Sequence, residues 1–413
     1  MKPDRQTIKK HLLFTLVAAI LGVASGIIVW LFLRVLTQGS EFIWEVVPEQ
    51  FSFSAYPLVI CTVGGLLVGW WRKRFGDYPE DLENVMTKVK ANGRYDSNRV
   101  IVIFVAALLP LLFGASLGPE AGLVCVIAAL ATYVGDRFKY LAKEMEELPV
   151  MGISATLGVL FSAPLFGFIA PIEGEADNLT FPKRQKVVIY LATILCGLGT
   201  NYLLVNYIGG GFAIARFETS QVGTTELIWA VPLALVGILS GLLYHLLARG
   251  TQWCIRPLER FPIWLAITGG ALLGLIAIFD PYALFSGEHG MFVIIDEWTT
   301  MGAIALLLIG LVKLFVTNVC LASGWRGGHI FPVIFAGVCI GFGMAKLTGV
   351  DAVFAVAVVS TSLSAAVIKK PIAVILIMLL LFPIKEIIIL TAAAFIGAAL
   401  PLDGRGKQLT KGH

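Results

Sequence analysis

Twelve apolar runs follow one another along this chain, and they constrain its fold more than any other feature of the sequence. They lie near residues 12–36, 55–71, 99–117, 119–134, 150–172, 184–207, 227–248, 262–279, 302–322, 331–348, 351–368 and 371–402. A helix needs about 20 apolar residues to cross the ~30 Å hydrocarbon core of a bilayer. Several runs are shorter than this or broken by Gly or Pro, as in transporters. We therefore predict an all-α polytopic membrane protein with tilted and broken helices.

The composition excludes most other classes of protein. Apolar residues make up 58% of the 413 residues and charged residues 14%, against about 25% charged residues in soluble domains. The mean hydropathy is +0.86. A soluble domain, a disordered chain and a nucleic-acid-binding protein all fit these values poorly. The six cysteines are scattered without metal-ligand spacing, so the sequence predicts no disulfide framework, no metal site and no cofactor.

The basic residues are distributed unevenly among the connections. Lys and Arg precede the first apolar run, follow the last one and are frequent in the connection 72–99. The connection 37–54 has no Lys or Arg and carries three Glu residues. The positive-inside rule then places both termini and 72–99 in the cytoplasm and 37–54 outside. Only a short polar tail follows the last run, so we expect one transmembrane domain over 1–413 without a soluble regulatory domain.

Three sequence features recur in the same order at nearly one spacing. The pairs are FGDYP (75–79) with SGEHG (286–290), GPEAG (118–122) with GGHIFP (327–332), and the segments that begin at Pro164 and Pro371. Self-similarity at a fixed offset is the signature of duplicated units. We therefore predict two homologous halves, a first over 12–207 and a second over 227–402.

The segment GPEAG contains an ionisable residue inside a long apolar stretch. A charge at the bilayer centre costs at least about 2.5–3.5 kcal/mol. Gly118 and Pro119 precede Glu120 and predict that it lies at a helix N-terminus. The N–H groups and the dipole there attract a carboxylate or a bound anion equally. An ionised Glu120 would therefore compete with an anion for this site, and a protonated Glu120 would leave the site free. The alternative is that Glu120 only caps its own helix.

The segment SGWRGGHIFPVIFAG (323–337) predicts a second Gly-rich helix start, with Pro332 in the first turn. Two helix N-termini aimed at one point would form an anion site without a full positive charge, and such a site can also release its ion. Arg326 would draw anions into a vestibule, or extend its charge to water at the membrane boundary. His329 is a titratable neighbour of this site, or an ordinary loop histidine.

Two more acids are candidates for proton transfer or ion entry. Glu173 follows an apolar run and would be reached by protons from the cytoplasm, or it is an ordinary polar helix end. Asp77, after Gly76, lies near the predicted inner mouth of a pathway, or it forms an Asx turn before Pro79.

An enzymatic alternative rests on GASLG (114–118), which has the G-x-S-x-G spacing of a serine nucleophile turn. Ser116 would need a histidine base within hydrogen-bond reach. His245, His289 and His329 are the available histidines, and none belongs to a recognisable second motif. We therefore predict a transport protein and not an enzyme. A secondary transporter of another small solute, also built from repeats, is a further alternative.

Three motifs in register resemble the CLC chloride channel and chloride/proton antiporter family. GPEAG resembles the family's G-R-E-G-P motif, which places Glu120 on the gating glutamate. GHIFP (328–332) resembles G-x-F-x-P, with Ile330 in the position of the first Phe. FSAPLFGFIAPIEGE (161–175) resembles N-A-P-L-x-G-x-x-x-x-x-E-E, with Glu173 on the first acid. Order and spacing agree from about 75 to 402.

The departures from the family pattern concern the central site. FGDYP corresponds to the family's G-S-G-I-P loop, so Gly76 replaces the anion-coordinating Ser. Gly174 stands where antiporters keep the internal proton-transfer glutamate, which leaves Glu173 or Glu175 as candidates. The last tyrosine is Tyr282, so the family's coordinating tyrosine near the C-terminus has no counterpart. The resemblance thus implies a divergent prokaryotic member without CBS domains.

The resemblance also implies a structure and a function. It implies antiparallel halves, a homodimer with one pathway per subunit, and a location in a prokaryotic plasma membrane. The transported ion would be chloride, or else fluoride or nitrate, with or without coupling to protons. Glu120 would be the gate, and Glu173 a second proton-transfer acid. The ion would lie among backbone groups of Gly118, Pro119, Ala121, Gly122, Gly328, His329, Ile330 and Phe331.

Overall fold

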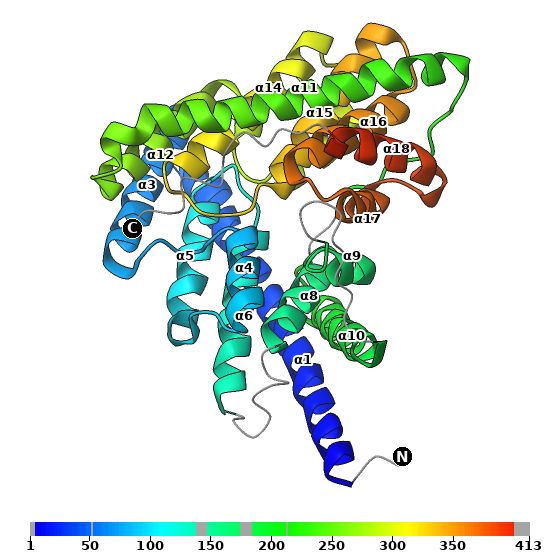
Figure 1. The fold of residues 1–413 in the computed structure, drawn as a ribbon. Helices are drawn as coiled ribbons and strands as arrows, with labels where there is room; N and C mark the ends of the chain where they lie inside the picture. The colour runs from blue at the N-terminus through cyan, green and yellow to red at the C-terminus, as the bar shows by residue number, and fades with distance from the viewer. Residues whose placement is uncertain (1–4, 51–52, 138–146, 174–183, 212–213, 400–413) are drawn as a thin grey trace.

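The computed structural model describes residues 5–50, 53–137, 147–173, 184–211 and 214–399, and these residues form an all-α protein, as predicted (Figure 1). The earlier helices are α1 (Arg5–Glu41), α2 (Val47–Gln50), α3 (Tyr56–Phe75), α4 (Leu82–Asn92), α5 (Val100–Leu112), α6 (Glu120–Arg137), α8 (Leu148–Leu160), α9 (Pro164–Ile169) and α10 (Arg184–Ile208). The later helices are α11 (Thr224–Ile255), α12 (Pro262–Phe279), α13 (Glu288–Glu297), α14 (Ala303–Ala322), α15 (Ile330–Thr348), α16 (Ala352–Ile368), α17 (Pro371–Leu381) and α18 (Ile387–Ala399). A π-helical turn, η1 (Phe42–Val46), continues α1.

Some of these helices are long enough to span a bilayer and others are not. Six helical segments of the described chain are long and apolar enough to cross a bilayer, while α5, α8, α16 and α17 are apolar but shorter. Short apolar helices end within the hydrocarbon region, where their unpaired backbone groups must be buried in protein or face a cavity. The helix ends between these short segments are therefore the places to look for a site.

Two of the predicted apolar runs are each divided between two helices. The run 150–172 forms α8 and α9, because Pro164 restricts the preceding residue to an extended conformation and Ser162 has a φ of +52°. The run 371–402 forms α17 and α18, which are separated at Pro383, a residue without an N–H to donate. Residues 400–402 of that run lie outside the described residues.

Glycines set the close packing between helices that are far apart in the sequence. α1 packs along α10, and a Cβ at Gly22 would lie 2.2 Å from the carbonyl oxygen of Thr193. α3 and α12 approach each other in the same way, and a Cβ at Gly65 would lie 2.4 Å from the carbonyl oxygen of Ala266. Membrane helices associate through such close contacts because lipid gives them no hydrophobic driving force. Figure 1 shows the result: α11 runs along one side of the later helices, and α6, α8 and α10 lie on the opposite side of the molecule.

Candidate functional site

The starts of α6 and α15 are joined by two backbone hydrogen bonds. The N–H of Gly118 donates to the carbonyl oxygen of Gly328 at 2.7 Å, and the N–H of Gly328 donates to that of Gly118 at 2.8 Å. Each glycine lies two residues before the first residue of its helix, Glu120 or Ile330. Two helix N-termini therefore meet at one point, as the paired glycine-rich segments predicted.

Glu120 fills the space between these helix starts. Its Oε1 accepts a hydrogen bond of 2.9 Å from the N–H of Ile330, and its side chain is buried. Its Oε2 is also buried and has no hydrogen-bond partner. A Cβ at Gly328 would lie 2.0 Å from the Cδ of Glu120, so this position needs a glycine. The carboxylate thus crosses from its own helix to cap α15.

The backbone groups available to an ion are fewer than the sequence predicted. The N–H groups of Gly118 and Gly328 are engaged with each other, and Pro119 has no N–H. These residues shape the junction but cannot donate to an anion in this arrangement. The remaining predicted donors are the amides of Ala121, Gly122, Ile330 and Phe331, in the first turns of α6 and α15, and that of His329, directly before α15.

A cavity of about 390 Å³ reaches Glu120 from the side of α11. We call it the α11-side cavity; polar residues on its wall include Asp81, Glu120, Tyr244, His245, Asn318, Arg326, His329 and Lys370. The ring of half-buried His329 lies 6.0 Å from that of Tyr244. Tyr244 was missed by the sequence analysis, which sought a tyrosine only near the C-terminus. The cavity wall thus combines apolar residues with polar side chains of both signs of charge.

A second cavity, of about 340 Å³, lies on the other side of the α6 start. We call it the η1-side cavity because Trp44 and Glu45 of η1 line it together with Leu117 and Pro119. Glu288 and His289 of α13 complete its polar wall. The junction of Gly118 and Gly328 therefore lies between two cavities that approach from different parts of the fold.

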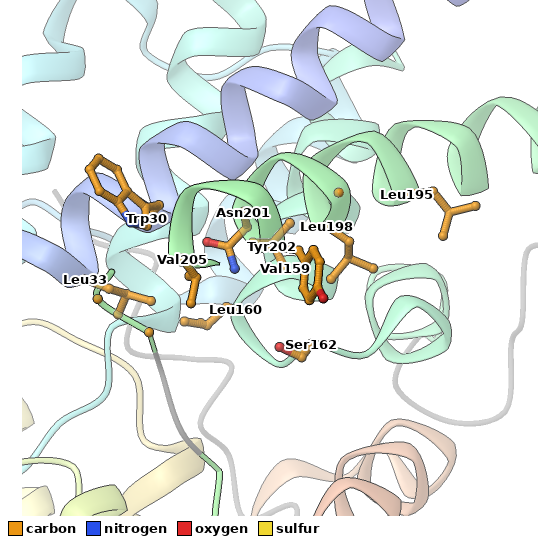
Figure 2. A pocket seen from close by; sticks show the side chains of 13 residues that line it. Trp30, Leu33, Val159, Leu160, Ser162, Leu195, Leu198, Asn201, Tyr202 and Val205 are labelled. Carbon is orange, nitrogen blue, oxygen red and sulfur yellow. The ribbon is translucent and has the colours of Figure 1, made fainter. Parts of the chain in front are cut away.

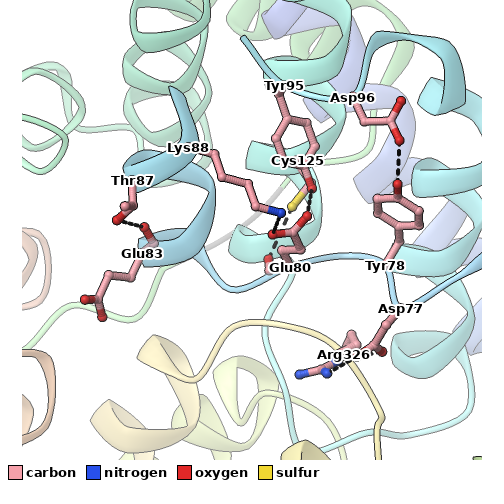
Figure 3. Close-up of polar contacts among 10 residues, drawn as sticks. All are labelled: Asp77, Tyr78, Glu80, Glu83, Thr87, Lys88, Tyr95, Asp96, Cys125 and Arg326. Atoms are coloured by element: carbon pink, nitrogen blue, oxygen red, sulfur yellow. Dashed lines mark hydrogen bonds and ion pairs between the residues drawn. The ribbon is translucent and has the colours of Figure 1, made fainter. Parts of the chain in front are cut away.

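Asp77 and Arg326 form an ion pair beside the α11-side cavity (Figure 3). Oδ1 of Asp77 also accepts a 2.7 Å hydrogen bond from Nε of Arg72. Burial raises the pKa of the Asp77 carboxyl, but the hydrogen bonds and charges of Arg326 and Arg72 outweigh burial and lower it below the usual value. Arg326, on the wall of the α11-side cavity, is thus held by an acid, and its predicted role in drawing anions stays a prediction; Gly76 has a φ of +105° in the turn before Asp77.

The connection that carries Asp77 is fixed against α6 by Glu80. The Glu80 carboxylate pairs with Lys88 at 2.5 Å and accepts a 3.2 Å hydrogen bond from the hydroxyl of Tyr95. The Glu80 carbonyl oxygen accepts a 3.2 Å bond from the thiol of Cys125 in α6. Figure 3 shows these three side chains converging on Glu80. One wall of the α11-side cavity is therefore rigidly attached to the helix that begins at Glu120.

Glu173 lies at a buried helix junction and not at an accessible helix end. Its two carboxylate oxygens accept hydrogen bonds from the N–H groups of Ile372, at 2.8 Å, and Ala373, at 2.6 Å. The residue is only 5% exposed. Glu173 thus caps the N-terminus of α17. Gly174 and Glu175, the neighbouring positions in the predicted motif, lie outside the described residues.

The surroundings of Ser116 do not support its role as a serine nucleophile. Its hydroxyl is buried and lies 3.1 Å from the hydroxyl of Thr317. Among the described residues, the hydrogen-bond partner of the Ser116 hydroxyl is therefore Thr317, and no histidine is bonded to it. The described ranges also hold no group of three or more His, Cys, Asp or Glu side chains that could bind a metal ion.

Lys313 is a buried cation that the sequence analysis missed. It lies within α14, and its Nζ donates to the carbonyl oxygens of Tyr282 at 2.9 Å, Leu284 at 2.9 Å and Phe285 at 2.6 Å. The charge is therefore satisfied by the turn that precedes α13. The available signal was a single lysine within the apolar run 302–322.

A further cavity, of about 530 Å³, lies between α1, α8 and α10 (Figure 2). Its wall is mostly apolar, with Trp30, Leu160 and Leu198 among the lining residues. Figure 2 shows Ser162, Asn201 and Tyr202 as its polar contributions. Glu120 and Gly328 line the α11-side cavity and not this one, which shares Leu33 and Gly211 with the η1-side cavity.

Comparison with known proteins agrees with this geometry. The model of the family described as "Voltage gated chloride channel" matches residues 64–401. A protein of Escherichia fergusonii named "Putative ion-transport protein YfeO" is 24% identical over 347 residues, covering 80% of this chain and 78% of that one. A protein of Shigella flexneri with the same name is 25% identical over 349 residues, with the same coverage.

Two solved structures share the fold. A CLC-type fluoride/proton antiporter superposes with a TM-score of 0.77 over 96% of both chains, at 17% identity. A slow cyanobacterial chloride/proton antiporter superposes with a TM-score of 0.73 over 93% of both chains, at 18% identity. The family match covers most of the chain, including both glycine-rich helix starts. The chain belongs to the voltage-gated chloride channel family, the CLC family of anion channels and antiporters.

Proposed function

We propose that this protein moves chloride across a prokaryotic plasma membrane and that Glu120 is its protonatable gate. The observation that carries this proposal is the hydrogen bond from the N–H of Ile330 to Oε1 of Glu120, between two cavities. A helix N-terminus is a natural anion site because its N–H groups and dipole both favour negative charge. The Glu120 carboxylate occupies a place that an anion would fill.

Gating follows from the charge of this carboxylate. A hydrogen bond to an ionised acceptor is roughly twice as strong as one between neutral groups. An ionised Glu120 therefore holds the N–H of Ile330 and excludes the ion. Protonation weakens that bond and removes the attraction to the α15 dipole, so the side chain leaves and chloride binds in its place. Loss of the proton then returns the carboxylate and displaces the ion.

The distribution of basic residues orients this pathway. The η1-side cavity is lined by the segment 37–54, which we place outside the cell, and the α11-side cavity by the 72–99 connection, which we place in the cytoplasm. Chloride would enter one cavity, pass the junction of Gly118 and Gly328 when Glu120 is protonated, and leave through the other. Both termini are then cytoplasmic.

Coupling to protons is expected to be weak or absent. A coupled antiporter needs a second acid that delivers protons from the cytoplasm, and Glu173 is the candidate. Both oxygens of Glu173 are bound to the start of α17, so proton transfer through it requires that cap to open. We therefore propose a channel, or an antiporter in which Glu173 limits the proton flux. As in the family, we expect a homodimer of two homologous, antiparallel halves per subunit, with one pathway in each.

The test is anion flux from proteoliposomes loaded with chloride, fluoride or nitrate, followed together with external pH. Wild type should release chloride, with a rate that rises as the pH falls, and Glu120→Gln should be fast at every pH. Proton uptake that accompanies chloride release and disappears in Glu120→Gln would show an antiporter. Absence of flux for all three anions in both proteins would contradict the proposal and favour a transporter of another solute.

A further inference from the structure

Two acids near the helix junction, Glu120 and Glu288, line different cavities. Glu120 is among the residues on the wall of the α11-side cavity. On the other side, the wall of the η1-side cavity contains its neighbour Pro119 and a different acid, Glu288. From the geometry we infer that Glu288 is the proton relay through which Glu120 exchanges protons with the η1-side cavity. This inference rests on the proposed function of Glu120 as the gate.

Glu288 is placed between the cavity and the junction. It is the first residue of α13 and follows Gly287, which has a φ of +92°. Its Oε1 is buried without a hydrogen-bond partner, while the side chain bonds to Ser286. Glu288 also lines a small cavity that it shares with Phe331, one residue beyond the amide bound by Glu120. A carboxylate with an unused oxygen at this position is ready to accept a proton.

Lys313 fixes the turn from which Glu288 projects. Its four hydrogen bonds hold the carbonyl groups of residues 282–285, which include Phe285 with an unfavourable φ of +58°. The N–H of Phe285 donates at 3.1 Å to the carbonyl oxygen of Gly114, in the loop before Glu120. The turn that leads to Glu288 and the loop that leads to Glu120 are therefore joined to each other. This hydrogen bond connects the two backbone segments that lead to Glu288 and Glu120.

Several charged or titratable groups surround Glu288. The charges of Glu120 and Lys313 both act on Glu288 across this interface. The remaining titratable residues on the wall of the η1-side cavity are Glu41, Glu45 and His289. Ionised Glu120 and Glu288 repel each other, so a proton bound to one favours the deprotonated form of the other. Lys313 attracts the ionised form of Glu288 and so acts against that repulsion.

The relay has two balanced steps. A hydronium ion in the η1-side cavity first gives its proton to the Glu288 carboxylate and remains as water. Neutral Glu288 then gives this proton to an intervening water molecule, which passes a proton on to the Glu120 carboxylate, and Glu288 becomes ionised again; Oε1 of Glu288 and Oε2 of Glu120 are not hydrogen-bonded to each other. Glu120 leaves the α15 N-terminus as a neutral acid. The reverse sequence returns the proton to the same cavity.

The test measures chloride flux in right-side-out and inside-out membrane vesicles, with the pH varied on one face at a time. In wild type, acid on either face should raise the flux. In Glu288→Gln, the response to pH on the η1 face should fall by about 100-fold or more, because about 100-fold is the smallest usual contribution of a positioned acid or base. The response to pH on the α11 face should persist. Glu288→Asp should recover part of the response to pH on the η1 face.

Matched variants separate the relay from general effects. Glu45→Gln removes an acid from the wall of the same cavity, and His289→Gln removes the adjacent titratable group; both should keep the wild-type response. A Glu288→Gln protein with a wild-type response on the η1 face would overturn the relay. So would equal loss of flux on both faces and at all pH values. Absence of chloride flux in wild type would instead contradict the proposed function.

Discussion

Two carboxylates of the first half of the chain cap helices of the second half, and their surroundings differ. Glu120 binds the start of α15 through one oxygen, and its second oxygen is unpaired at the end of a cavity. Glu173 binds the start of α17 through both oxygens. The first cap can be exchanged for another anion, while the second is saturated. Under the proposed function, helix capping can serve as a gate only where the cap is incomplete and an ion can reach it.

The largest expected effect comes from removing the saturated cap. Glu173→Ala leaves the buried N–H groups of Ile372 and Ala373 without partners, and each such group costs about 1–3 kcal/mol. We expect the free energy of unfolding to fall by about 2–6 kcal/mol, the sum for two such groups. Thermal unfolding in detergent measures this change. Glu120→Ala is the matched variant, and it should lower stability much less because the α11-side cavity admits water or an anion to the N–H of Ile330. Equal losses in both variants would remove the distinction between the caps.

A smaller effect is expected when the gate is displaced without being removed. In Gly328→Ala, the new Cβ would lie 2.0 Å from Cδ and 2.1 Å from Oε1 of Glu120, so the carboxylate must leave α15. The chloride flux at neutral pH should then rise about tenfold, which corresponds to about 1.4 kcal/mol. It should also lose most of its pH dependence while Glu120 is still present. Gly302→Ala, where a Cβ meets nothing within 4 Å, is the control for the substitution itself. A Gly328→Ala protein with wild-type pH dependence would contradict the placement of the gate.

The smallest effect concerns the ion pair at the side of the α11-side cavity. Asp77 is 48% exposed, so Asp77→Asn should cost only about 0.2–1 kcal/mol at neutral pH and less at high salt. The folded-state pKa of Asp77 is below its usual value of about 3.9. The pair therefore stabilises the protein above that pH, and its contribution disappears as the pH falls through the folded-state pKa. Unfolding temperatures of both proteins, measured against pH and salt, should converge in acid; a difference that persists there would contradict the ion-pair account.

The sequence was sufficient for the helix starts that form the site. Gly and Pro before Glu120, and the matching segment before Ile330, predict helix N-termini because each residue type favours that position through its own backbone geometry. A buried acid in an apolar stretch is also visible in the sequence, since its energetic cost demands a reason. These are local properties of the sequence. The constant spacing between the two segments was enough to identify them as corresponding helix starts.

The partners of the charged side chains were not predictable in the same way. Glu173 binds residues 199 and 200 positions away, and Asp77 binds Arg326 249 positions away. Lys313 binds carbonyl groups of a turn, which have no sequence signature because every residue carries one. Such contacts depend on how helices from distant parts of the chain pack. The same dependence explains why Glu288 looked like part of a polar loop rather than a possible relay.

The backbone bridge between Gly118 and Gly328 has a consequence for the biosynthesis of this protein. It joins positions 210 residues apart, so the first half leaves the ribosome long before its partner segment exists. Until then, the α6 start and the Glu120 carboxylate lack the amide groups that satisfy them. Contacts of such high sequence separation form late and slowly. The junction between the starts of α6 and α15 can therefore form only after the second half has been made, and a chain that ends before Gly328 would carry Glu120 in the membrane without the amide that binds it.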